Sequence, residues 1–241
     1  MDDTRERIVL GYAGTAASAA ALRRWRDAGA DVVTVTVDVG QARDVDEVRE
    51  QAVAAGALRA HAFDLRLEFA LDFVLPALRT RPLEALADGV LASPLVERKL
   101  AEVAAIERAA RVDGAEAFDV PDDPERRRRR TARTLLERPV TDPAQAPDAG
   151  ARVELTIEAA VPVAINGVAL DAAEVLESVA LIAGHHGIGR LPHLDAPAIP
   201  VLHAAYAALG GRDGIVQFEF HKGRLTLTPA HDDNSYLVNH A

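Results

Sequence analysis

The 241-residue chain contains no cysteine, which excludes disulfide scaffolds, thiolate zinc sites and thiol nucleophiles. It also lacks any apolar run that approaches the roughly 20 residues of a membrane helix. Its first residues, MDDTRER, are charged and run straight into a strand-like apolar segment, so we expect no signal peptide. These absences predict a cytoplasmic protein that has no membrane partner.

Positive charge is scarce too. Lysine and arginine number 27 against 37 aspartate and glutamate residues, which gives a net charge of −10. This balance argues against nucleic acid as a partner. Lysine occurs only at Lys99 and Lys222. Because the excess of arginine accompanies abundant alanine, we attribute it to genome composition rather than to phosphate binding.

The residues that are present predict a folded globule, since 49% are hydrophobic and 27% are charged. Strands are expected at about residues 7–12, 31–37 and 59–63, with helices between them. The first helix carries Ala21, Leu22 and Trp25 on one face, and the second covers about residues 44–55. This alternation predicts a parallel sheet.

Further elements follow this sheet. We expect helices over residues 67–78 and 93–110, the second burying Val96, Leu100, Val103 and Ile106, and a short strand over residues 115–120. The stretch over residues 139–150 contains several prolines and is interpreted as a linker.

The remaining residues predict a smaller antiparallel α+β unit. Residues 152–167 alternate apolar and polar side chains up to a turn at Asn166-Gly167. Asp171 is the expected N-cap of a helix that ends near Gly184, and residues 198–209 form a second helix. A hairpin follows, joined through residues 221–223.

One loop has the position of an anion site. GYAGTAAS, residues 11–18, lies between the first strand and its helix, where free backbone N–H groups and the helix dipole point to one spot. It matches neither the dinucleotide nor the P-loop fingerprint.

The order of several segments carries a family resemblance. Four segments in the first half of the chain together resemble argininosuccinate synthase in sequence and spacing: IVLGYAGTAAS, TVDVGQARDVDEVREQAVAAGA, FDLRLEFALDFVLPALR and SPLVERKLAEVA. TDPAQAPD, VPVAINGVAL and GHHGIGRLPH are similar to that family's second domain. The resemblance implies a parallel-sheet α/β domain of the adenine nucleotide alpha hydrolase-like (HUP) type, followed by a smaller α+β synthetase-type domain.

The resemblance also implies a domain division and an activity. A nucleotide-binding-like domain is expected over residues 1–120, an arginine-rich helix and proline-rich linker over 121–150, and a reduced synthetase or oligomerisation domain over 151–241. The family is implied to use ATP and Mg to adenylate citrulline, after which aspartate displaces AMP. It usually assembles as a tetramer.

The pyrophosphate loop departs from the family pattern SGGxDxS. Gly14 matches the first glycine, and Ser18 stands at a closing hydroxyl position. Ala13, Thr15 and Ala17 replace the leading serine, the second glycine and the aspartate. Each lost charge-assisted hydrogen bond is worth roughly 1.5–3 kcal/mol, so the combined losses are expected to weaken ATP binding.

The amino-acid sites depart as well. Ser93 stands where the family has an arginine for citrulline, and no tyrosine lies nearby. AFDVPDDPERRRRR replaces the aspartate-binding loop, and part of the synthetase domain and the helical tail have no counterpart. We therefore carry over no citrulline or aspartate ligand and name no catalytic residue. The residual nucleotide-binding candidates are Tyr12, Ala13, Gly14, Thr15, Ser18, Val37 and Asp38.

Asp38 has two interpretations. It matches the aspartate of the family's TADxGQ segment at the carboxyl edge of the sheet, where ligands bind. It is equally suited to be a carboxylate that caps its own loop.

Three other clusters have a chemical interpretation and a structural one. One chemical interpretation of His185, His186 and His193 is metal binding or acid–base catalysis. Because no acidic ligand pattern accompanies these histidines, we favour a structural role and predict no metal. The run Arg126–Arg130, with Arg133 and Arg138, suggests an anion clamp, although upstream acids favour a solvated or interface helix. The tail residues, interpreted as solvated, are His231, Asp232, Asp233 and His240.

Three functions remain open, in this order. The first is a shortened argininosuccinate synthase homologue without ordinary activity, acting as a pseudoenzyme, a subunit partner or a binding protein. The second is an ATP-dependent ligase for another amino-acid-like substrate, and the third is an authentic citrulline–aspartate ligase. If the chain is active, ATP and Mg are its cofactors; otherwise it has none. We expect a homo-oligomer, dimer or tetramer, or association with another protein subunit.

Overall fold

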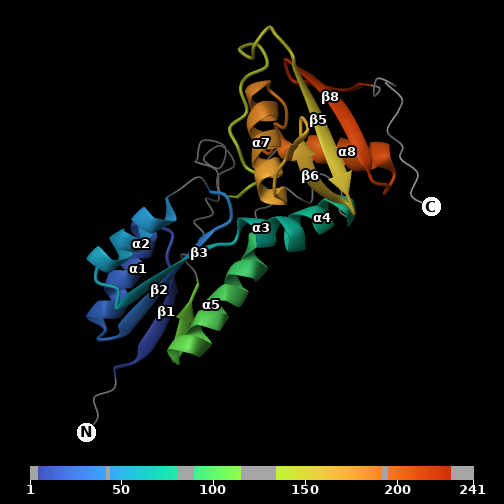
Figure 1. Cartoon of the computed structure of the whole chain (residues 1–241). Coiled ribbons are helices and arrows are strands. Elements are labelled where there is room, and N and C mark those ends of the chain that lie inside the picture. Colours follow the sequence, from blue (N-terminus) through green and yellow to red (C-terminus); the bar gives the residue numbers. More distant parts are fainter. Residues whose placement is uncertain (1–4, 42–43, 81–89, 115–133, 192–194, 229–241) are drawn as a thin grey trace, which may run out of the picture.

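The computed structural model describes residues 5–41, 44–80, 90–114, 134–191 and 195–228. Within these ranges the chain forms a four-stranded sheet in the order β3-β2-β1-β4 and a five-stranded sheet in the order β7-β6-β5-β8-β9 (Figure 1). All pairings in the first sheet are parallel, and those in the second are antiparallel. The predicted α/β part followed by a smaller α+β part is therefore confirmed.

The parallel sheet contains the three predicted strands and one that we did not predict. The long second strand consists mainly of valine and threonine, whose β-branched side chains suit a buried strand. The unpredicted strand pairs with the first, Ile8 lying opposite Arg111. The strand predicted over residues 115–120 lies outside the described residues. The strands are β1 (Arg7–Gly11), β2 (Asp31–Asp38), β3 (Arg59–Asp64) and β4 (Arg111–Asp113).

Two helices cover one face of this sheet (Figure 1). Leu22 of the first helix and Val48 of the second join Leu10 and Val32 in one buried cluster. The apolar positions predicted for these helices are therefore the ones that pack. The helices are α1 (Ala16–Asp27) and α2 (Val45–Ala54).

Two helical stretches follow β3, and the second of them packs on the opposite face of this sheet, against β1, β2 and β4. The helix predicted over residues 67–78 is interrupted by a π-helical turn just before Pro76, which has no N–H to continue the α-helical pattern. A short 3₁₀ turn, η3 (Val90–Ala92), precedes the second stretch. The helices are α3 (Arg66–Phe69), the π-helical η1 (Ala70–Val74), α4 (Leu75–Thr80) and α5 (Ser93–Glu107).

The inner face of α5 differs from the prediction at its end. Val96, Leu100 and Val103 are buried as predicted, but Ile106 is 78% exposed. At about 100° per residue the buried stripe reaches position 107 rather than 106. Glu107 is accordingly the buried residue, and α5 ends there rather than at residue 110.

Residues 134–150 contain no helix or strand in the structure, although they are packed against the rest of the molecule. Leu135, Leu136 and Val140 are buried, and the Thr141 N–H donates to the carbonyl oxygen of Gly184 at 2.9 Å. The linker over residues 139–150 and the domain boundaries remain predictions.

The antiparallel sheet has one face covered by helices. Val153, Leu155 and Phe218 point to the covered side and are buried. Asn166 and Gly167 both have positive φ, so they form the predicted turn. The strands are β5 (Ala151–Glu158), β6 (Val161–Ile165), β7 (Val168–Ala169), β8 (Gly214–His221) and β9 (Arg224–Thr228), and the helices are α7 (Ala172–His185) and α8 (Ala198–Leu209).

The N-terminus of α7 carries the predicted cap. The Asp171 carboxylate accepts from the Glu174 N–H at 2.8 Å, and Glu174 accepts from the Asp171 N–H at 3.1 Å. One buried apolar cluster runs from the parallel sheet through α3–α4 and α5 to α7, α8 and the antiparallel sheet. No helix in the described ranges has the length and apolar character to span a membrane.

Candidate functional site

Two loops leave the carboxyl edge of the parallel sheet, where open α/β sheets bind ligands. The first joins β1 to α1, and the second, residues 38–41, follows β2. Because β1 and β2 are hydrogen-bonded neighbours, with Gly11 opposite Val35, the loops lie side by side. The structure therefore brings the predicted nucleotide-binding residues to one edge of the sheet.

The first loop is held by its own hydroxyl groups. Gly14 has φ of +66°, and Thr15 is the N-cap of α1. The Thr15 N–H donates to Ser18 Oγ at 2.9 Å, and the Ser18 N–H donates to Thr15 Oγ1 at 3.1 Å. Ser18 Oγ also donates to the Thr15 carbonyl oxygen at 3.0 Å, and its residue is fully buried. Both hydroxyls thus serve the helix cap.

The first turn of α1 carries no acidic side chain, and Ala17 is exposed there. Tyr12 belongs to the core cluster beneath the loop. Its N–H donates to the Val35 carbonyl oxygen, and its own carbonyl oxygen accepts from Thr36 Oγ1, both at 2.9 Å. Tyr12 and Ser18 therefore have structural roles, and any contact of theirs with a nucleotide remains a prediction.

The second loop is also closed by its own side chains. The Asp38 carboxylate accepts from the Gly40 N–H at 2.8 Å. Gln41 donates to the carbonyl oxygen of buried Val37 at 2.6 Å and accepts from the Val39 N–H at 2.7 Å. Asp38 thus caps its own loop, as one of its two interpretations expects; nucleotide binding by Val37 and Asp38 remains a prediction.

Arg66 joins this edge to the second part of the molecule, and we did not predict it. Its guanidinium lies 2.8 Å from Asp64, 3.7 Å from Asp38 and 3.6 Å from Glu177 of α7. The hydrogen bond from Arg66 lowers the pKa of the Asp64 carboxyl. The signal for Arg66 was its place directly after β3, since the carboxyl ends of parallel strands meet at one edge.

Arg138 was interpreted either as part of an anion clamp or, as we favoured, as part of a solvated or interface helix. It lies outside any helix in the structure, and its guanidinium contacts protein groups. It donates to the Gly40 carbonyl oxygen at 2.9 Å and lies 3.5 Å from Glu177. Beside it, the Leu135 N–H donates to the Val39 carbonyl oxygen at 2.7 Å. Residues 134–140 therefore cover one side of the second loop. Arg126–Arg130 and Arg133 lie outside the described residues.

The histidine pair is split by the end of α7. His185 is exposed, whereas His186 is buried and its carbonyl oxygen accepts from the Gly223 N–H at 2.7 Å. Among the described residues, no group of three or more histidine and acidic side chains has metal-binding geometry. The predicted residues His193, His231, Asp232, Asp233 and His240 lie outside the described ranges.

Comparison with known families bears on most of the chain. Residues 7–116 match the family model described as "Arginosuccinate synthase N-terminal HUP domain", and residues 132–203 match the model of the C-terminal domain of the same enzyme. The chain belongs to the argininosuccinate synthase family. The HUP-type fold predicted for the first part is thereby confirmed. Ser93, which we predicted to stand in place of the family's arginine, is the first residue of α5.

Curated relatives carry the same name at modest identity. The argininosuccinate synthase of Shouchella clausii is 27% identical over 257 residues, which cover 79% of this chain and 64% of the relative. That of Listeria monocytogenes is 26% identical, with coverages of 79% and 64%, and that of Halalkalibacterium halodurans is 26% identical, with coverages of 93% and 71%. The chain thus spans about 64% of the length of the first two relatives.

Proposed function

We propose that this argininosuccinate synthase homologue does not carry out ordinary citrulline–aspartate ligation and acts as a non-catalytic subunit or a binding protein. The observation that carries the proposal is the closed hydroxyl pair of the first loop. The Thr15 N–H and both hydroxyls of Thr15 and Ser18 are bonded within the loop. A pyrophosphate would have to displace these bonds before the loop offered it the same donors.

The side chains at the loop do not fit the nucleotide that the family implies. Ala13 and Ala17 offer no hydroxyl or carboxylate, and Thr15 places a side chain where a glycine would let the phosphate approach the backbone. Two or three lost contacts at roughly 1.5–3 kcal/mol each weaken binding by several powers of ten. We therefore derive no catalytic step through ATP or Mg.

The second loop supports the same conclusion. Asp38 is engaged by Gly40 and lies beside Arg66, while Arg138 holds the Gly40 carbonyl oxygen. A ligand that used these groups would break contacts between the two parts of the molecule. As partner we propose a second copy of the chain or another protein subunit.

Titration of the purified protein with Mg–ATP by calorimetry tests the proposal, together with an assay of AMP and pyrophosphate release from citrulline, aspartate and ATP. We expect neither saturable binding nor release. Saturable binding with release would overturn the proposal and support the alternative, an ATP-dependent ligase for citrulline and aspartate or a related amino-acid substrate.

Loop variants locate the cause. Ala13→Ser, Thr15→Gly and Ala17→Asp combined recreate the family pattern except for its last serine, where this chain has Ala19, and should restore measurable Mg–ATP binding. Ala20→Asp is the control, because it adds the same charge at an exposed position one turn further along α1. Equal binding by the combined variant and the control would contradict the assignment of the defect to the loop.

A further inference from the structure

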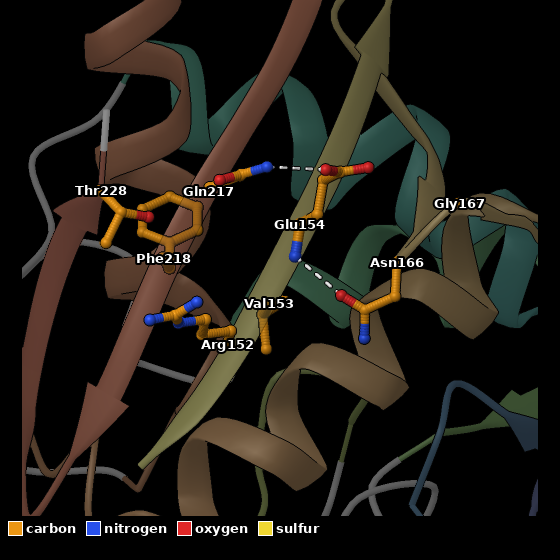
Figure 2. A pocket seen from close by; sticks show the side chains of 8 residues that line it. All are labelled: Arg152, Val153, Glu154, Asn166, Gly167, Gln217, Phe218 and Thr228. Carbon is orange, nitrogen blue, oxygen red and sulfur yellow. Dashed lines mark hydrogen bonds between the residues drawn. The ribbon is translucent and has the colours of Figure 1, made fainter. Parts of the chain in front are cut away.

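A hollow lies on the outer face of the antiparallel sheet and uses none of the residues of the two loops. Its volume is about 370 Å³, and it crosses β9, β8, β5 and the turn after β6 (Figure 2). The helix-covered side of this sheet holds the buried Val153 and Phe218 side chains, so the polar side chains of the hollow face the other way. This volume lies at the lower end of the range for small-molecule sites.

A row of polar groups forms the floor of the hollow. The Gln217 amide nitrogen donates to the Glu154 carboxylate at 2.9 Å, and the Asn166 side-chain oxygen accepts from the Glu154 N–H at 2.8 Å (Figure 2). Thr228 lies opposite Gln217 in the register of β8 and β9. Within the described part of the chain, the Asn166 side-chain NH₂ and the Gln217 side-chain oxygen remain available to a ligand.

Two opposite charges stand beside this row without neutralising each other. Arg152 and Glu154 are alternate residues of β5, so they share a face with Cα atoms about 6.7 Å apart. No carboxylate among the described residues lies within ion-pair distance of Arg152, not even Glu219 directly across the sheet. Among the described residues, the Glu154 carboxylate accepts a side-chain hydrogen bond only from the neutral amide of Gln217.

We propose that the hollow binds a free α-amino acid with a neutral polar side chain. The ligand's carboxylate pairs with Arg152 and its ammonium with Glu154. In an α-amino acid the carboxylate and the ammonium are attached to the same carbon atom. The two groups can therefore lie between the Arg152 and Glu154 side chains, which belong to alternate residues of β5. Charge-assisted hydrogen bonds of this kind are about twice as strong as neutral ones.

The polar residues at the floor of the hollow favour a ligand that has a polar side chain. Asn166 offers an amide donor, Gln217 an amide acceptor, and Thr228 a hydroxyl group that does both. A terminal amide on the ligand can donate to the Gln217 side-chain oxygen and accept from the Thr228 hydroxyl, since these two residues are neighbours on β8 and β9. The proposal extends that of a binding protein by naming its ligand class, but it does not rest on the state of the ATP loop.

Titration of the full chain with L-glutamine, followed by amide chemical shifts in the absence of ATP, tests this site. We expect saturable shifts at residues 152–154, 166 and 217. N-acetyl-L-glutamine lacks the ammonium and L-glutaminamide lacks the carboxylate, so each should bind at least about tenfold more weakly. No saturable shift at tens of millimolar L-glutamine, or equal binding of the blocked analogues, would overturn the proposal.

Two variants test the contributions of the Arg152 and Glu154 charges separately. Arg152→Gln and Glu154→Gln should each weaken L-glutamine binding about tenfold or more. Arg224→Gln is the matched control, because it removes an exposed arginine of β9 that does not line the hollow. Circular dichroism establishes that each variant is folded. If Arg152→Gln binds as well as Arg224→Gln, the hollow is not an amino-acid site, whatever the outcome with Mg–ATP.

Discussion

Glu107 places a carboxylate inside the first part of the molecule, at the last residue of α5. Its side chain is 3% exposed and lies 3.1 Å from Arg59, 3.2 Å from His61 and 3.4 Å from Arg7. Glu107→Gln leaves these groups without their counter-charge. Because the partners are partly exposed, we expect a loss of about 1–3 kcal/mol in the free energy of unfolding, less than for a fully buried pair. Urea denaturation measures it.

The control for this variant is Glu97→Gln, which changes an exposed glutamate of the same helix and should be nearly neutral. Burial acts to raise the pKa of Glu107, but the hydrogen bonds from His61 and Arg59 outweigh it and lower the pKa. The stabilisation is therefore complete above about pH 4.3 and is lost as the pH falls through the folded-state pKa. A penalty that does not shrink on acidification would contradict this assignment.

His186 should make stability depend on pH in a higher range. Burial lowers its pKa, and the charges of His185 and His221 lower it further. The folded state therefore binds fewer protons than the unfolded one, so the stabilisation is complete above about pH 6.5 and declines below it. Between about pH 5 and pH 7, the free energy of unfolding of His186→Gln should change less than that of the wild type.

The matched control is His203→Gln, on the exposed side of α8. Its denaturation profile across the same pH range should keep the slope of the wild type. Equal slopes for all three proteins would mean that the His186 proton is not linked to folding.

Among the elements, the loop after β2 depends on a glycine for two separate reasons. Gly40 has φ of +93°, and a Cβ there would lie 2.6 Å from the backbone and side chain of Leu135. Gly29 has φ of +87° but open space around it. Gly29→Ala should therefore cost only the backbone strain, about 1–2 kcal/mol, whereas Gly40→Ala should cost about 1–3 kcal/mol more.

Thermal and urea unfolding of both variants measure the difference between them. The larger loss at Gly40 reports the packing of residues 134–140 against the second loop. If the two variants lose the same stability, that packing contributes nothing beyond the backbone conformation.

Most elements were predictable because their signals are local. The valine-rich stretch over residues 31–37 forms β2, and Asp171 caps α7 as expected. The errors arose where a distant partner decides the outcome. The three-residue strand β4 is paired with β1, and Glu107, which helical geometry turns inward, is tolerated there because Arg59 and His61 neutralise it.

For the candidate site too, the positions of the loops were predictable from sequence, whereas the long-range contacts between them and the rest of the chain were not. Sequence placed Thr15, Ser18 and Asp38 at the carboxyl edge, since strand order alone determines which loops meet there. The contacts that close the edge join Arg66 to Glu177 and Arg138 to Gly40, across more than ninety residues in each case. No periodicity or local motif specifies such pairs.

For the molecule as a whole, one edge of the parallel sheet favours self-association. Within the described residues β4 pairs only with β1, and its Val112 is 49% exposed beside α5, where Ile106 is 78% exposed. An open strand edge with apolar neighbours invites pairing. We expect at least a dimer by light scattering. Ile106→Glu should shift it toward monomer, whereas Leu181→Glu, on α7 and 68% exposed, should not; a monomeric wild type would contradict the prediction.

The shared core makes a further prediction about the whole chain. Phe69 of α3 and Leu176 of α7 belong to one buried cluster that reaches both sheets, and Arg66 adds an ion pair to Glu177 between them. The two parts should therefore unfold together. Trp25 of α1 is the single tryptophan and reports on the first part only. Its fluorescence and the far-ultraviolet circular dichroism of the whole chain should give the same urea midpoint; separate midpoints would mean that the two sheets are independent folding units, joined by a contact too weak to couple them.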